Sequence, residues 1–121
     1  KVETIDEFVT QFLNSNSKGQ FAVFEKKTFL FNNKGVMINE FFGEDKYLAT
    51  LETKFAETCY EAAHSLYAGT MEDIGKEIYM GSFKKPKDPE FFIMEEIECF
   101  DVDWPWQLEI AEIMYKNKTD E

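Results

Sequence analysis

The feature that most restricts the fold is a long periodic stretch from Glu44 to Ala68. Its apolar residues recur at spacings of three and four, at Leu48, Leu51, Phe55, Cys59, Ala62 and Leu66. Residues with this spacing share one face of an α-helix. Gly69 follows directly, and glycine is the commonest residue just past a helix end. The pattern therefore predicts one long helix over 44–68 that lies across a sheet.

Strand-like segments precede and follow this stretch. Three short runs, 21–26, 28–32 and 36–42, are rich in β-formers, and an Asn/Gly turn at 32–35 separates the last two. Such a turn between apolar runs indicates a hairpin. We therefore predict an antiparallel meander over residues 20–42. Residues 91–102 return to strand character and supply one later strand.

Three further helices complete the predicted order. Thr4 and Glu7 form a capping-box pattern at the start of the first, whose apolar face carries Ile5, Phe8, Val9, Phe12 and Leu13. Thr70 is an N-cap candidate for a short helix that ends at Gly81. Asp103 is the N-cap candidate for the last helix, with Pro105 in its first turn. We predict a single α+β domain over residues 1–121, with a small antiparallel sheet packed against the long helix and flanking helices.

Composition supports a folded chain. Hydrophobic residues make up 44% of the 121 residues and aromatic residues 17%, which is too apolar for a disordered polypeptide. The sequence shows neither a signal peptide nor an apolar run long enough to span a membrane. Cys59 and Cys99 do not form a disulfide framework. These features predict a cytoplasmic protein.

The charge excludes several classes of partner. The formal net charge is −11, and all thirteen cationic residues are lysines. Arginine is the preferred donor to phosphates and base edges, so its absence argues against direct nucleic-acid recognition. An acidic surface also repels anionic lipid. We therefore expect no direct binding to nucleic acid or membrane.

A long acidic segment is the most unusual feature of the chain. Between Lys87 and Lys116 lie 28 residues with no lysine, arginine or histidine and with nine carboxylates. Five of these carboxylates fall within 95–103: Glu95, Glu96, Glu98, Asp101 and Asp103. On a strand, Glu96 would share a face with Glu98, and Asp101 with Asp103.

Two interpretations of this segment concern its contacts with other protein chains. One is a solvated, charged edge strand that resists pairing with other chains. The other is a docking face for a partner with a basic surface, such as a nucleic-acid-binding protein, because carboxylates about 7 Å apart on a strand resemble a row of phosphates. Trp104 and Trp106 would then supply contact anchors, although core packing is expected for at least one of them.

A third interpretation is a divalent-metal site. Asp101 and Asp103 with Glu96 or Glu98 offer the hard oxygen ligands that Mg²⁺ or Ca²⁺ prefers. The motif is unspecific, because Asp-x-Asp recurs in any acidic chain, and phosphoryl transfer would also need a cation that this segment lacks. A small metal-dependent enzyme is the alternative function that it predicts.

No other motif indicates catalysis or a cofactor. His64 is the only histidine, and on the predicted helix it lies about 140° around the axis from Cys59, at 100° per residue. Cys99 would meet it only by a coincidence of the fold. The chain carries neither a glycine-rich phosphate loop nor a nucleophile elbow. We therefore expect no catalytic residue, bound metal or cofactor.

The size, acidity and absence of catalytic motifs are similar in general type to those of small inhibitors, immunity proteins and phage-encoded antagonists. This likeness implies no role for any single residue. The sequence predicts a non-enzymatic, protein-binding inhibitor that acts as a nucleic-acid mimic. An accessory or scaffold subunit of a larger assembly is a further alternative, and it would carry a broad apolar contact surface.

Overall fold

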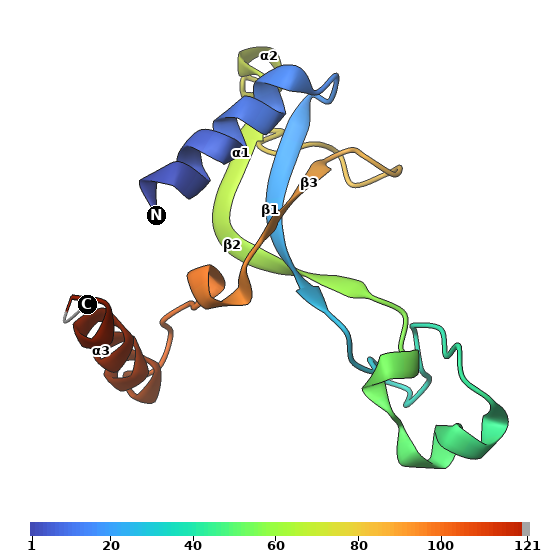
Figure 1. The fold of residues 1–121 in the computed structure, drawn as a ribbon. Coiled ribbons are helices and arrows are strands. Elements are labelled where there is room, and N and C mark those ends of the chain that lie inside the picture. The colour runs from blue at the N-terminus through green and yellow to red at the C-terminus, as the bar shows by residue number, and fades with distance from the viewer. Residues whose placement is uncertain (120–121) are drawn as a thin grey trace.

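A three-stranded mixed sheet forms the centre of the fold (Figure 1). The computed structural model describes residues 1–119, so residues 120 and 121, the end of the predicted domain, lie outside the described residues. The strands are β1 (Gly19–Lys26), β2 (Cys59–Gly69) and β3 (Glu90–Met94). The α-helices of this described part are α1 (Val2–Asn14), α2 (Met71–Ile74) and α3 (Pro105–Thr119), and its 3₁₀ helices are η1 (Asp45–Thr50), η2 (Thr53–Phe55) and η3 (Glu96–Cys99). The predicted α+β class is confirmed.

The central strand β1 is the most buried element. It pairs antiparallel with β2 and parallel with β3, so the sheet order is β2-β1-β3. Ala22, Val23 and Phe24 are buried, as expected for a central strand with a hydrogen-bonded neighbour on each edge. The buried Gln20 side chain donates to the carbonyl of Phe8 at 2.8 Å and accepts from the Gln11 side chain at 3.1 Å. Its amide is therefore satisfied inside the core.

Helix α1 covers the sheet through one side of its apolar surface. Phe8 is buried and meets Phe92 of β3 edge to face, with the ring centroids 5.2 Å apart. The predicted capping box is wrong, because α1 begins at Val2 and the Thr4 hydroxyl bonds to Glu98 instead. The predicted N-cap at Thr70 is confirmed, since its hydroxyl accepts the backbone N–H of Asp73 at 3.2 Å.

The predicted long helix over 44–68 is wrong. Residues 59–69 form strand β2 against β1, and only the short η1 and η2 turns precede it. Leu51 takes a left-handed conformation (φ 47°) and ends η1. Tyr60 and Tyr67 favour a strand. Pairing of β2 with β1 also satisfies the backbone N–H and C=O groups along that edge of β1, which would otherwise be unpaired. This tertiary pairing outweighs the helical spacing of the apolar residues.

The predicted antiparallel meander over 20–42 is also wrong beyond β1. Residues 28–42 carry only an isolated antiparallel bridge between Phe31 and Met37 and another from Phe41 to Ala56. The hairpin turn itself is confirmed, with Gly35 at φ 78° and the N–H of Asn32 bonded to the carbonyl of Val36. The later strand is real, but it is shorter than predicted and pairs parallel to β1.

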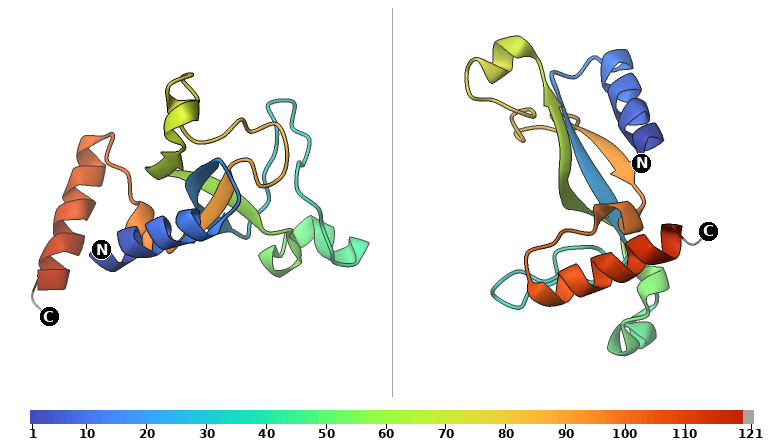
Figure 2. Two further views of the ribbon diagram at one scale, coloured as in Figure 1. Left: turned by 90° about the horizontal axis from the view of Figure 1, so that it is seen from above. Right: turned by 90° about the vertical axis from the view of Figure 1, so that its left-hand side faces the viewer.

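Residues 27–58 project from one end of the sheet (Figures 1 and 2). A chain of aromatic contacts holds this projecting region: Phe29 to Phe41 at 6.0 Å, Phe41 to Phe55 at 5.8 Å, and Phe55 stacked on Tyr47 at 5.2 Å. The buried Asn39 side chain donates to the carbonyl of Thr28 at 2.7 Å. A satellite cluster of this kind is typical under long loops.

Strand β2 contains a wide bulge opposite Ala22. Phe21 pairs with Tyr67 and Val23 with Ala62, so Ala22 faces four residues, 63–66. His64 lies in this bulge with a left-handed backbone (φ 54°). Bulges of this kind bend a strand and redirect its side chains.

No helix in the described part of the chain has the length and apolarity that a membrane crossing requires.

Candidate protein-binding surface

The predicted acidic face does not lie on a strand. β3 ends at Met94, and the chain continues through η3 and an extended stretch to Pro105 (Figure 1). The expected pairing of Glu96 with Glu98 and of Asp101 with Asp103 on strand faces is therefore wrong. A one-turn 3₁₀ helix turns successive side chains in different directions. The five carboxylates are thus divided between the interior and the solvent.

Glu98 is turned toward the interior. The Thr4 hydroxyl lies 2.9 and 3.0 Å from its two carboxylate oxygens, and the α-ammonium group of Lys1 lies 3.1 Å from one of them. The Glu98 side chain is only 15% exposed. These hydrogen bonds, from Thr4 first, lower the pKa of Glu98. Glu98 therefore ties η3 to α1 and is not available to a partner.

Glu96 is exposed but paired within the chain. Its carboxylate lies 2.8 Å from the ammonium nitrogen of Lys26, which also sits 5.3 Å from the centre of the Phe24 ring. The hydrogen bond to Glu96 raises the pKa of Lys26, and the charge of Glu61 adds to the effect. Because the ammonium group of Lys26 lies beside it, Glu96 contributes little net negative charge at the surface. An exposed pair of this kind adds little to stability.

The other three predicted carboxylates point to solvent. Glu95, Asp101 and Asp103 are exposed, and within residues 1–119 their carboxylates have no hydrogen-bond or ion-pair partner. The carbonyl of Glu95 accepts the backbone N–H of Glu98 at 3.0 Å and the Cys99 thiol at 3.4 Å. These three side chains are the uncompensated part of the predicted site.

Both tryptophans are on the surface. Trp104 is 64% exposed and Trp106 57% exposed, so the expectation that at least one packs in the core is wrong. The Gln107 side chain accepts the backbone N–H groups of Asp103 at 2.7 Å and Trp104 at 2.8 Å. This is the returning half of a capping box. It fixes the start of α3, with Trp104 and not Asp103 directly before the helix.

The sequence analysis missed three exposed apolar residues of this segment: Ile97, Phe100 and Val102. Together with the two tryptophans they alternate with the exposed carboxylates. We call residues 95–106 the acidic–aromatic segment. The predicted strand over 91–102 included these three apolar residues, and a strand of this kind is expected to bury one face. The sequence signal that marks them is the dense alternation of acidic and apolar residues around Pro105, which leaves no continuous apolar face.

A cavity of about 410 Å³ lies beside this segment, against the bulge of β2. Its lining includes His64, Cys99, Glu61, Glu96 and Asp101. The fold thus brings His64 and Cys99 to one cavity, as the sequence analysis expected only by coincidence. Burial, together with the charges of Glu98 and Glu96, raises the pKa of Cys99. A thiol held protonated is a poor nucleophile.

The structure also bears on the proposed metal ligands. Glu98 faces Thr4, Glu96 faces Lys26, and Asp103 follows on the extended stretch. In the part of the chain that the structure describes, no group of three or more His, Cys, Asp or Glu side chains is arranged to hold a metal ion. A divalent ion needs several oxygen ligands converging at one point, and these carboxylates diverge.

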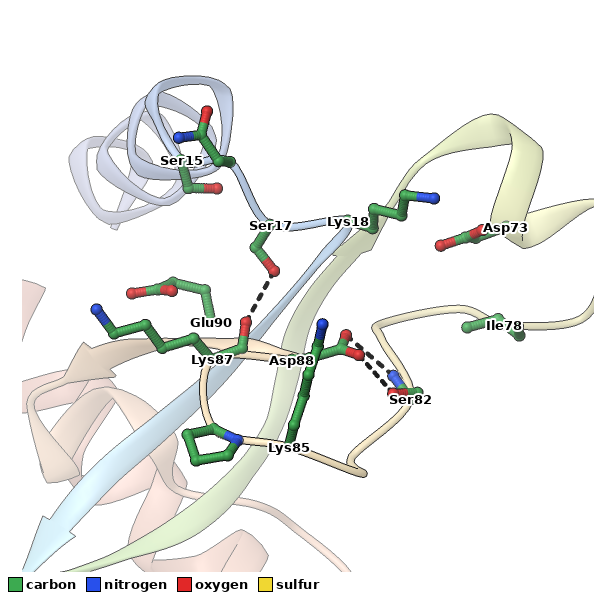
Figure 3. A pocket seen from close by; sticks show the side chains of 12 residues that line it. Ser15, Ser17, Lys18, Asp73, Ile78, Ser82, Lys85, Lys87, Asp88 and Glu90 are labelled. Carbon is green, nitrogen blue, oxygen red and sulfur yellow. Dashed lines mark hydrogen bonds between the residues drawn. The ribbon is translucent and has the colours of Figure 1, made fainter.

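A second hollow, of about 670 Å³, lies at the other end of the sheet, between the loop after α1 and the loop before β3 (Figure 3). Ser17 donates to the carbonyl of Lys87 at 3.1 Å. Both the hydroxyl and the backbone N–H of Ser82 bond to the Asp88 carboxylate, and they lower the pKa of Asp88. Three lysines and three carboxylates line this hollow: Lys18, Lys85, Lys87, Asp73, Asp88 and Glu90. Their formal charges cancel, so the hollow has no net charge that would select an ion.

No protein-family model matches the chain, and no curated protein matches its sequence.

Proposed function

We propose that this chain is a non-enzymatic protein-binding module that docks its acidic–aromatic segment on the basic surface of a partner protein, as an inhibitor or antagonist does. The observation that carries the proposal is the state of residues 95–106. Glu95, Asp101 and Asp103 are exposed and have no partner within residues 1–119, and Trp104 and Trp106 stand exposed beside them.

Charge and aromatic contact have separate roles in this proposal. Carboxylates at the rim steer a cationic partner and make association fast and salt-sensitive. Tryptophan is among the residues that most often dominate binding energy once desolvated. An acidic rim around aromatic anchors is a common arrangement of interfaces, which place apolar side chains at the centre and polar ones at the edge.

The class of partner is narrower than acidity alone implies. The row of carboxylates spaced like phosphates depended on a strand that the structure does not contain, so the form of nucleic-acid mimicry suggested by that spacing loses its support. The sign of the charge remains, and a nucleic-acid-binding protein with a lysine- or arginine-rich surface remains a fitting partner. The proposal places both proteins in the cytoplasm, where the free thiols of Cys59 and Cys99 stay reduced.

Charge reversal of the unpaired carboxylates tests this proposal. The variant carries Glu95→Lys, Asp101→Lys and Asp103→Lys, and its matched control carries Glu40→Lys, Asp45→Lys and Glu77→Lys, three exposed acids outside the segment. Each variant changes the net charge equally. The readout is the amount of partner captured from a lysate of the source organism at low and high salt, with the captured protein identified by mass spectrometry.

We expect the segment variant to lose capture and the control to keep it, and we expect high salt to release the partner. Capture that is the same for both variants contradicts the proposal. Calorimetric titration with Mg²⁺, Mn²⁺ and Ca²⁺ separates the metal-dependent enzyme, because a tight stoichiometric site would support that alternative and oppose a docking segment.

One observation favours a second candidate, an accessory subunit of a larger assembly. Large apolar side chains are exposed on α1, on α3 and in the projecting region, and not only in the acidic–aromatic segment. Extended apolar surface of this kind marks protein contacts. A subunit held by such contacts would stay bound at high salt, whereas an electrostatically docked partner would be released.

A further inference from the structure

The exposed area of the chain is too large for an isolated monomer. Its accessible surface is 9343 Å² for a mass of 14.2 kDa. A monomeric globular protein of this mass exposes about 6,800 Å², so the excess is about 2,500 Å². A standard interface buries about 800 Å² on each partner. The excess therefore leaves room for a stable interface in addition to the acidic–aromatic segment.

Helix α1 carries part of this exposed surface. Val2, Ile5, Val9 and Leu13 are spaced by three, four and four residues, so they share one helical face. Phe8 points to the sheet, but these four side chains are between 47% and 76% exposed. We call them the α1 face. It runs the length of the helix, and Asp6, four residues after Val2, borders it.

Helix α3 carries a further part of it. Ile110 and Ile113 are spaced by three residues and are 40% and 58% exposed; we call them the α3 face. Leu108 and Tyr115 are also exposed on the same helix. Figures 1 and 2 show α3 standing away from the sheet, to which it is joined by residues 100–104. A helix that is apolar over more than half of its circumference is normally buried.

We propose that a second copy of this chain covers the α1 and α3 faces, so that the protein is a homodimer. A two-fold axis presents each face twice and closes the assembly at two chains. The excess above the monomer expectation, about 2,500 Å², is larger than the area of about 800 Å² that a standard interface buries on each partner. This proposal goes beyond the docking function, because it uses other side chains and does not require a basic partner.

Charge gives the dimer a signature that the docking function lacks. Two chains of net charge −11 repel each other, and salt screens that repulsion, with a Debye length of about 8 Å at 0.15 M and 3 Å at 1 M. The contact itself is apolar and is not weakened by screening. Raising the salt concentration should therefore tighten the dimer, whereas it should release a basic partner from the acidic–aromatic segment.

Sedimentation equilibrium of the full chain at several protein and salt concentrations tests the proposal. We expect a particle of twice 14.2 kDa whose dissociation constant falls as salt rises. Val9→Glu and Ile113→Glu should each raise the dissociation constant by roughly 100-fold or more. Leu48→Glu is the matched control, an exposed leucine in the projecting region, and it should leave the constant unchanged. Val9→Ser and Ile113→Ser repeat the test if either glutamate variant does not fold by circular dichroism.

A monomer at every concentration and salt overturns the proposal, whether the cause is closure of α3 on its own chain or a different protein as the occupant. A dimer that both helix-face variants leave intact also overturns it. The Glu95→Lys, Asp101→Lys, Asp103→Lys variant should not weaken the dimer. Loss of partner capture with an intact dimer therefore reports on the docking function alone.

Discussion

The sheet and the C-terminal segment use similar residues in opposite ways. Phe24 and Phe92 are buried between β1, β3 and α1, with other apolar side chains packed around them. Trp104 and Trp106, with larger rings, stand in solvent, and α3 leaves most of its apolar surface open. The comparison teaches that apolar composition marks a contact surface without saying whether the other side of the contact belongs to the same chain.

The largest expected effect on stability concerns the buried core of the sheet. Phe92→Ala removes a ring that is packed edge to face on Phe8. We expect the free energy of unfolding to fall by about 3–5 kcal/mol, because the substitution loses both transfer energy and packing. Urea denaturation followed by circular dichroism measures it. A loss below about 1 kcal/mol would mean that the sheet packs as loosely as the C-terminal segment.

Two glutamates of the same segment sharpen the comparison further. Glu98→Gln weakens the hydrogen bonds from Thr4 and should cost about 1 kcal/mol, whereas Glu95→Gln, at an exposed position, should stay within about 0.5 kcal/mol.

The pH dependence of the Glu98 contribution has a definite sign. Because the folded pKa of Glu98 is lowered, its contribution is present above the ordinary glutamate pKa of about 4.3 and is lost as the pH falls through the folded pKa. Unfolding curves across this acidic range should converge for the wild type and Glu98→Gln. Curves that stay separated there would contradict the assignment.

The next effect concerns how α3 begins. Gln107→Ala removes the acceptor of the backbone N–H groups of Asp103 and Trp104, so the first turn should loosen by about 0.5–1 kcal/mol. Amide hydrogen exchange at residues 103 and 104 should accelerate, while exchange in β1 should not. Gln107→Glu is the control, because a carboxylate oxygen also accepts these bonds. Equal exchange in both variants would show that the start of α3 does not depend on this side chain.

The smallest expected effect on stability concerns an exposed residue of the acidic–aromatic segment. Trp104→Ala should change the free energy of unfolding by no more than about 0.5 kcal/mol, because the ring is mostly solvated, and yet it should weaken partner capture. Urea denaturation gives the first quantity and the capture experiment the second. A large loss of stability would place Trp104 in a core contact that the exposed ring does not indicate.

Some of the local chemistry was predictable from the sequence, although the capping box at Thr4 and the N-cap at Asp103 were wrong, and pairing over long distances was not predictable. The turn at 32–35, the N-cap at Thr70 and Pro105 at the start of α3 all depend on neighbouring residues, and each is present. In β2, Cys59, Ala62 and Leu66 have helical spacing, and yet the segment forms a strand because β1 is there to pair with it. A periodic pattern cannot report such a partner.

The candidate site divides in the same way. The exposed acids Glu95, Asp101 and Asp103 follow from the charge pattern, since isolated carboxylates seldom lie in a core. The inward turn of Glu98 does not follow, because it requires Thr4, 94 residues away, to lie beside η3. Its neighbours in the sequence give no sign of that contact.

The position of β1 between β2 and β3 has a consequence for biosynthesis. β1 spans residues 19–26, yet its parallel neighbour begins only at Glu90. A ribosome adds about 5–20 residues per second, so β1 emerges several seconds before the strand that closes one of its edges. Until then its backbone is open to other nascent chains, and contacts of such wide sequence separation also form slowly. β1 can pair with β2 once residue 69 has emerged, but its other edge stays unpaired until β3 is available.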